Sequence, residues 1–303
     1  MTRREALKLA AGAAVGSPAA GGIGTFLQFW RSHQDWDAAR WSQLFGYLSE
    51  LHVRELVIQW TRYDGIDYAP LTARVLELAD QAGMSVWVGL AHESSWWRSV
   101  EQGGAAAQLG RIAERHLALA QELNPAVRGR AAFRGWYLPE EIDDGHWAGR
   151  AGTEALRAHV SRLHRGLRPL AMSGFSNAIV TPADLGSFWK RVAGGGLEKV
   201  LFQDGIGARP ANAKSWPERL DALSRSLGRK LTVVVEIFEP AGDAAEFRGR
   251  PAPWSRIEWQ LVVARRSTRN APVLFSLPEY ATPMGGDQAA RLYEDWRRAA
   301  APR

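Results

Sequence analysis

The sequence predicts an α/β fold, a closed (β/α)8 barrel of the TIM type, and three observations carry this prediction. Eight short apolar or β-branched runs alternate with stretches of helical periodicity. The length of 303 residues suits one such barrel. No run is followed by a G-x-G-x-x-G turn opening a helix, which weakens the alternative of a doubly wound, dinucleotide-binding sheet.

The expected strands are short and rich in Val, Ile, Leu and aromatic residues, as buried parallel strands are. They cover residues 24–30, 55–60, 84–91, 133–139, 169–175, 199–204, 231–238 and 273–277.

The stretches between the strands place apolar residues three and four positions apart, which indicates amphipathic helices. They cover residues 36–51, 71–82, 106–122, 153–165, 182–193, 217–227 and 253–266, and a last helix over 286–299 closes the chain. We find no internal repeat or linker, so residues 23–303 are expected to form a single domain.

The first 22 residues are expected to be a twin-arginine export signal. Arg3 and Arg4 precede a mildly apolar stretch at 9–16 and small residues at 17–20. The protein would then be periplasmic or secreted; the alternative is a helical extension that stays on the chain. The apolar run is too short for stable membrane insertion.

Composition excludes several classes of site. Cysteine is absent, so disulfides, thiolate zinc sites and thiol nucleophiles are excluded. The formal charge is +6, but the basic residues are scattered and nearly all are Arg, without the basic aromatic stripe of nucleic-acid binders. We therefore expect no nucleic-acid partner, although an acidic polysaccharide is compatible with the Arg excess.

A run of carboxylates ends the fourth predicted strand. Glu140, Glu141, Asp143 and Asp144 follow an apolar run with no Lys or Arg among them. Side chains alternate along a strand, so Glu141 should point into the barrel mouth with Tyr137, and Glu140 toward the rim.

The seventh predicted strand carries Glu236 within the run Val-Val-Val-Glu-Ile-Phe. A buried carboxylate without a partner is costly, so this residue requires a function or a partner, such as an Arg in a structural ion pair.

Active sites of such barrels form at the carboxyl ends of the strands. Amide, carboxylate and aromatic side chains collect there, and the following are expected to bind a substrate: Gln28, Trp30, Gln59, Trp60, His92, Tyr137, Gln203 and Asp204. An aromatic ring at the rim can stack on the apolar face of a sugar, although Trp is equally often a core residue.

Two carboxylates across such a mouth predict glycoside hydrolysis, with Glu141 as the acid/base and Glu236 as the nucleophile or base. No metal or cofactor is expected. One alternative is a non-catalytic barrel that binds glycans. Another is a metal-dependent sugar isomerase or lyase, with His92, Glu93, Glu141, Asp204 and Glu236 as oxygen-rich ligands.

Several motifs together resemble the bacterial domain-of-unknown-function 4434 family. They are Thr25–Gln28, Ile58–Trp60, Gly135–Pro139 with Glu141, Phe202–Gly207 and Glu236–Glu239. The resemblance implies an often exported, glycosidase-like TIM barrel and names no substrate.

The placement of the two carboxylates also resembles that in retaining glycosidases with carboxylates on strands four and seven. Those enzymes usually have Asn before the strand-four Glu, where this chain has Glu140. A carboxyl separation of about 5–5.5 Å would indicate retention, and about 6.5–9.5 Å inversion.

Overall fold

The computed structural model describes residues 22–241 and 249–300. Eight parallel strands close into a barrel in the order β1-β13-β10-β9-β8-β7-β5-β2. Their bounds are β1 (Ile23–Leu27), β2 (Val53–Ile58), β5 (Ser85–Gly89), β7 (Phe133–Ile142), β8 (Leu170–Gly174), β9 (Lys199–Gln203), β10 (Leu231–Glu236) and β13 (Val273–Phe275). Each overlaps one predicted strand, so the predicted fold class is confirmed.

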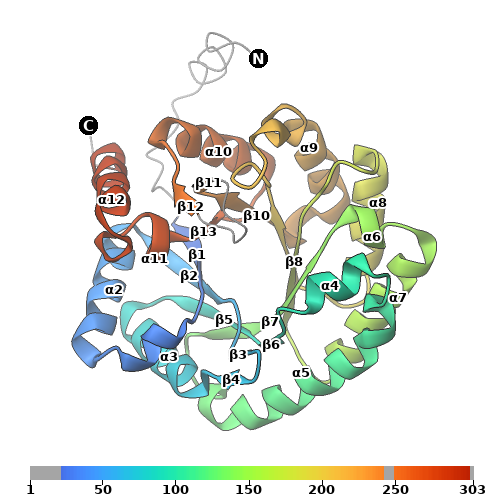
Figure 1. Ribbon diagram of the computed structural model, residues 1–303, viewed down its shortest axis with the longest axis horizontal. Helices are drawn as coiled ribbons and strands as arrows, with labels where there is room; N and C mark the ends of the chain where they lie inside the picture. Colours follow the sequence, from blue (N-terminus) through green and yellow to red (C-terminus); the bar gives the residue numbers. More distant parts are fainter. Residues whose placement is uncertain (1–21, 242–248, 301–303) are drawn as a thin grey trace.

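Helices surround the barrel (Figure 1). The longer ones are α2 (Ala38–Glu50), α3 (Ala69–Ala82), α5 (Ala105–Val127), α7 (Arg150–His164), α8 (Pro182–Ala193), α9 (Trp216–Leu227), α10 (Trp254–Ser267) and α12 (Asp287–Ala300). All eight predicted helices are therefore present. Local signals fix their ends: the Thr181 hydroxyl accepts from the Asp184 amide before α8, and Gly83 ends α3 in the left-handed region at φ 64°.

Several short elements that were not predicted lie between the barrel strands and the long helices along the chain. They are the helices α4 (Trp96–Glu101), α6 (Asp144–Trp147) and α11 (Leu277–Tyr280), the 3-10 turns η1 (Arg31–Asp35), η2 (Pro210–Lys214), η3 (Gly228–Lys230) and η4 (Pro283–Gly285), the sheet of β3 (Arg62–Tyr63), β4 (Ile66–Asp67) and β6 (Ala91–His92), and the hairpin of β11 (Phe238–Pro240) and β12 (Gly249–Pro251). The eighth strand ends earlier than predicted, because the chain turns into α11 after Phe275.

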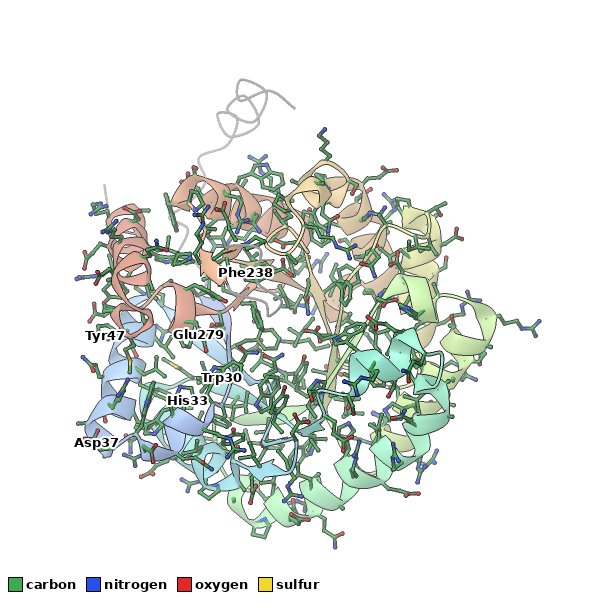
Figure 2. All side chains as sticks on the ribbon, viewed as in Figure 1. Trp30, His33, Asp37, Tyr47, Phe238 and Glu279 are labelled. Carbon is green, nitrogen blue, oxygen red and sulfur yellow. The ribbon has the colours of Figure 1, made fainter. Side chains whose placement is uncertain are left out.

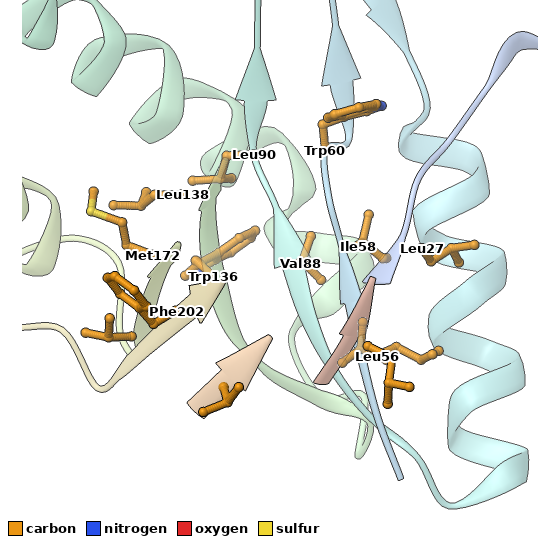
Figure 3. Packing of buried hydrophobic residues seen from close by; sticks show 14 of the residues in the cluster. Leu27, Leu56, Ile58, Trp60, Val88, Leu90, Trp136, Leu138, Met172 and Phe202 are labelled. Carbon is orange, nitrogen blue, oxygen red and sulfur yellow. The ribbon is translucent and has the colours of Figure 1, made fainter. Parts of the chain in front are cut away.

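The barrel strands contribute side chains to two apolar layers. The inner layer fills the barrel with Phe26, Val57, Trp87, Tyr137, Ala171, Leu201, Val234 and Val273. The outer layer lies between the strands and the helices, and Figure 3 shows part of it, including Ile58, Trp60, Trp136 and Leu138. Alternate residues of each strand therefore face opposite layers, which decides where the polar residues at the strand ends point.

The predicted export signal at 1–22 lies, except for Gly22, outside the described residues. In the part of the chain that is described, no helix is both long and apolar enough to cross a bilayer.

Candidate active site

Glu141 sits on a bulge at the end of β7. Leu138 pairs with Met172 of β8, but the next paired residues are Ile142 and Gly174, so β7 holds two extra residues. Pro139, which lacks a backbone N–H, lies in this bulge. Two extra residues preserve the alternation, because Leu138 and Ile142 both belong to the outer layer. Glu141 therefore keeps the inward direction expected from the sequence.

Two side chains hold Glu141 in place. The Gln203 Nε2 atom, at the end of β9, donates to Glu141 Oε1 at 2.7 Å. The Trp96 indole donates to the Glu141 backbone carbonyl at 3.2 Å. Burial raises the pKa of Glu141, and the hydrogen bond from Gln203 partly offsets this rise because it favours the charged form.

Glu140 points the opposite way, toward α5. Its Oε2 atom lies 3.0 Å from His116 Nε2, and both side chains are buried. Burial alone would raise the pKa of Glu140, but His116, with His92 and His159 beyond it, brings that pKa below its usual range. Glu140 is thus a buried, paired carboxylate on the side of β7 that faces α5. It does not point into the barrel mouth with Glu141.

Glu236 ends β10 on the inner face, since Val234 fills the barrel and Val233 and Val235 belong to the outer layer. Its Oε2 atom accepts from the Ala208 amide at 2.8 Å. No Lys or Arg of the described chain forms an ion pair with its carboxylate, so the alternative of an Arg-paired structural Glu is not what the structure contains.

The proton affinity of Glu236 is unusually high. Burial, the charge of Asp204 and then that of Glu141 raise its pKa to about 8, against the amides of Ala208 and Gly207, which lower it. Glu236 therefore keeps its proton near neutral pH. It is close enough to Glu141 for the charge of that carboxylate to raise its pKa.

Asp204 lies behind Glu236 as a supporting residue. Its Oδ2 atom accepts from Gln260 Nε2 of α10 at 2.6 Å, and its Oδ1 atom accepts from the amides of Ile206 at 3.1 Å and Glu236 at 3.4 Å. The side chain is only 3% exposed. Burial also raises the pKa of Asp204, but these three donors favour its charged form, which leaves the shared proton on Glu236.

Arg256 of α10 binds the same loop through backbone oxygens. Its guanidinium donates to the carbonyls of Phe238 at 2.6 Å and Glu236 at 3.1 Å. The cation fixes the path of the chain after β10 without forming an ion pair with the Glu236 carboxylate.

Three predicted substrate-binding residues lie differently from the expectation. Tyr137 is fully buried inside the barrel, and its hydroxyl lies 2.7 Å from Ser173 Oγ instead of orienting a carboxylate. Trp60 belongs to the outer layer, where its indole donates to the Phe29 carbonyl at 3.1 Å. Asp204 is buried, and its carboxylate accepts from Gln260 and from backbone amides. All three side chains are therefore buried and already have hydrogen-bond partners.

The other predicted residues stay at the carboxyl ends of the strands. Gln28 and Gln59 follow β1 and β2, and Gln203 ends β9. Trp30 is exposed, and the His92 ring stacks on Trp60 at 5.8 Å between ring centroids.

The residues of the metal hypothesis do not form a metal-binding group in the described part of the chain. Glu93 pairs with Arg115, and Asp204 is bonded to Gln260 and to backbone amides. Within residues 22–241 and 249–300, no group of three or more His, Asp or Glu side chains is arranged to hold a metal ion.

Two residues that sequence analysis missed, His116 and Gln260, support the carboxylates from the helices. Each was visible as a polar residue inside an apolar helical stripe. His116 lies among Ile112, Ala113, Leu119 and Ala120, and Gln260 among Ile257, Leu261 and Ala264. A buried polar residue in such a stripe requires a partner, but the stripe does not say which one.

Known proteins share this architecture. The barrel is similar to the crystal structure of a proposed alpha-L-fucosidase from Bacteroides thetaiotaomicron, with a TM-score of 0.71 and 18% identity over 96% of this chain and 98% of the other. It is also similar to the GH18 chitinase ChiB of Flavobacterium johnsoniae, with a TM-score of 0.51 and 11% identity over 92% and 93% of the two chains. At these identities the likeness shows the fold.

A closer sequence relative is the uncharacterized protein YbcH of Escherichia coli K12, 29% identical over 256 residues, which cover 78% of this chain and 83% of YbcH. The family described as "Domain of unknown function (DUF4434)" matches residues 23–285, which include every strand of the barrel and both Glu141 and Glu236. The chain belongs to this DUF4434 family.

Proposed function

We propose that the protein is a glycoside hydrolase that uses Glu236 and Glu141 as its pair of carboxyl groups. The observation that carries the proposal is that Glu236 and Glu141 both face the inner side of the same barrel end, where burial and the charges of Asp204 and Glu141 raise the pKa of Glu236 to about 8. Glycoside hydrolysis needs one protonated and one charged carboxyl group. Similarity to barrels that include glycoside hydrolases supports the same reaction class.

The electrostatics favour roles opposite to those expected from the sequence. Glu236, next to the charged Asp204, would donate its proton to the oxygen of the leaving sugar. Glu141, whose charged form accepts a hydrogen bond from Gln203, would attack the anomeric carbon or activate a water molecule. The bond between the anomeric carbon and the leaving oxygen breaks as that oxygen takes the proton.

The test measures new reducing ends released from neutral, amino and uronic-acid polysaccharides by the protein, Glu141→Gln and Glu236→Gln. Both variants should lose at least about 100-fold in rate, since general acid catalysis alone typically contributes about 10²–10⁴-fold. Aryl glycosides with good leaving groups separate the roles, because they need little protonation. They should restore activity to Glu236→Gln and not to Glu141→Gln. Activity that survives in both variants on polysaccharides would refute the assignment.

We also propose that the protein is exported by the twin-arginine route, on the sequence of its first 22 residues. Fractionation of cells expressing the full chain should find it outside the cytoplasm, and replacing Arg3 and Arg4 with Lys should retain it inside. Unchanged distribution of that variant would contradict this route.

A further inference from the structure

Trp30 is a large apolar side chain exposed at the carboxyl end of the barrel, with 43% of its surface accessible. Three contacts fix it. Its backbone N–H donates to His33 Nδ1 at 3.0 Å, and its ring stands on Trp60 edge to face, with centroids 5.9 Å apart at 82°. Its indole also lies close enough to the Glu279 carboxyl to act as a hydrogen-bond donor. An exposed ring held in this way can stack on a flat ligand.

His33 is suited to hold Trp30 at neutral pH. Burial, followed by the charge of Arg40, lowers the pKa of His33 to about 4. The imidazole is therefore neutral under physiological conditions, and its Nδ1 atom can accept the Trp30 N–H.

Glu279 lies beside Trp30 in Figure 2, on α11 after the last barrel strand. Burial raises its pKa, against hydrogen bonds from Ser276 and Trp30. None of the ion pairs in the described chain includes Glu279, Glu141 or Glu236. Among the described residues, these three carboxyl groups at the barrel end thus form no ion pair, within a protein whose formal net charge is +6.

Gln59 supplies a separate sign of a ligand. It lies at the end of β2, two residues after the inward-facing Val57, and is only 7% exposed. Its Oε1 atom is buried and has no hydrogen-bond partner in the described chain. A buried amide oxygen without a partner is unfavourable, and a hydroxyl donor from a bound molecule would satisfy it.

From these contacts we propose that Trp30, Gln59 and Glu279 form a subsite for an uncharged sugar unit. One face of the sugar ring stacks on Trp30, and hydroxyl groups donate to the Gln59 oxygen and the Glu279 carboxyl. A uronic-acid unit would place its carboxylate close to Glu279, which has no ion-pair partner among the described residues, and like charges repel. This subsite names a substrate class for the proposed function. The inference that its ligand is a sugar rests on that proposed function.

The test measures binding by calorimetry with the full chain carrying Glu141→Gln, so that no probe is cleaved. The probes are neutral cello-, xylo- and chito-oligosaccharides, and oligogalacturonate as the anionic comparison. At least one neutral probe should bind, Trp30→Ala should weaken its binding at least about 10-fold, and Trp30→Phe should retain most of it because a flat ring remains. Tyr47→Ala, on the outer helix α2, is the matched aromatic control and should bind normally.

Three outcomes would overturn the subsite: binding that Trp30→Ala leaves unchanged, preference for oligogalacturonate, or no binding of any probe. A Glu279→Gln variant that keeps its fold by circular dichroism provides a second test and should also bind more weakly. Failure of the catalytic proposal is distinguishable. In that case neutral probes bind through Trp30, but the wild-type protein releases no reducing ends from them.

Discussion

Replacing Glu236 with Gln should change how stability depends on pH, and this consequence can be measured without knowing the substrate. The pKa of Glu236 is raised from 4.5 to about 8 in the folded protein. Below pH 4.5 the residue is protonated in both states and carries no penalty. As the pH rises through that window, the unfolded state loses the proton first and folding stability falls. A glutamine side chain at this position cannot ionise, so the Glu236→Gln variant should escape this loss.

The raised pKa sets the size of the effect. A shift of that extent corresponds to about 5 kcal/mol at about 1.4 kcal/mol per pKa unit, and sharing the proton with Asp204 reduces it to about 2–4 kcal/mol. Urea unfolding at intervals from pH 4.5 to 8.5 should therefore show the free energies of unfolding of wild type and Glu236→Gln diverging in favour of the variant. Glu101→Gln, an exposed residue ending α4, should follow wild type. Parallel curves for wild type and Glu236→Gln would refute the raised pKa.

Three further predictions concern the surroundings of the two carboxyl groups. Burial and the charge of Asp204 raise the pKa of Glu236, and Asp204→Asn removes that charge, so the alkaline limb of the pH–rate profile should move down by about 1–2 units. An unmoved alkaline limb would contradict the acid role. Gly207→Ala should lower kcat at least about 10-fold while a cooperative thermal transition remains, because the new Cβ would lie 2.7 Å from Glu236 Cβ; normal kcat would contradict the tight contact. His116→Ala should cost about 3–5 kcal/mol in urea unfolding, because it leaves Glu140 buried without its partner, and adding Glu140→Gln should recover much of that loss. An unchanged free energy of unfolding in His116→Ala would show that the pair is not needed.

The sequence was sufficient for the fold, because each strand and long helix carries its own periodic signal. It was also sufficient for the inward direction of the Glu141 side chain, since the bulge on β7 adds an even number of residues and leaves the alternation intact. The same alternation explains two misplaced residues. Trp60 directly follows Gln59, and Asp204 directly follows Gln203, so only one member of each pair can face inward.

The partners of the carboxyl groups could not be predicted, since they depend on contacts between distant parts of the chain. His116 reaches Glu140 from α5, and Gln260 reaches Asp204 from α10 across 56 residues of sequence. Such pairings depend on how each helix packs on the barrel, which hydrophobic periodicity along one segment does not specify.

The arrangement of cations around β10 explains how a basic protein maintains an acidic site. Arg256 lies beside the loop after Glu236, but its guanidinium donates to backbone carbonyls, which carry no net charge. The Glu236 carboxylate forms no ion pair with this guanidinium. A direct ion pair would have stabilised the charged form of Glu236 and lowered its pKa. The arginine thus shapes the loop and its charge lowers the pKa of Asp204, while burial, the charge of Asp204 and the backbone amides act on the pKa of Glu236. The proposed chemistry requires a proton on Glu236, so a guanidinium that binds the carbonyls of this loop and not the carboxylate is compatible with the acid role proposed for Glu236.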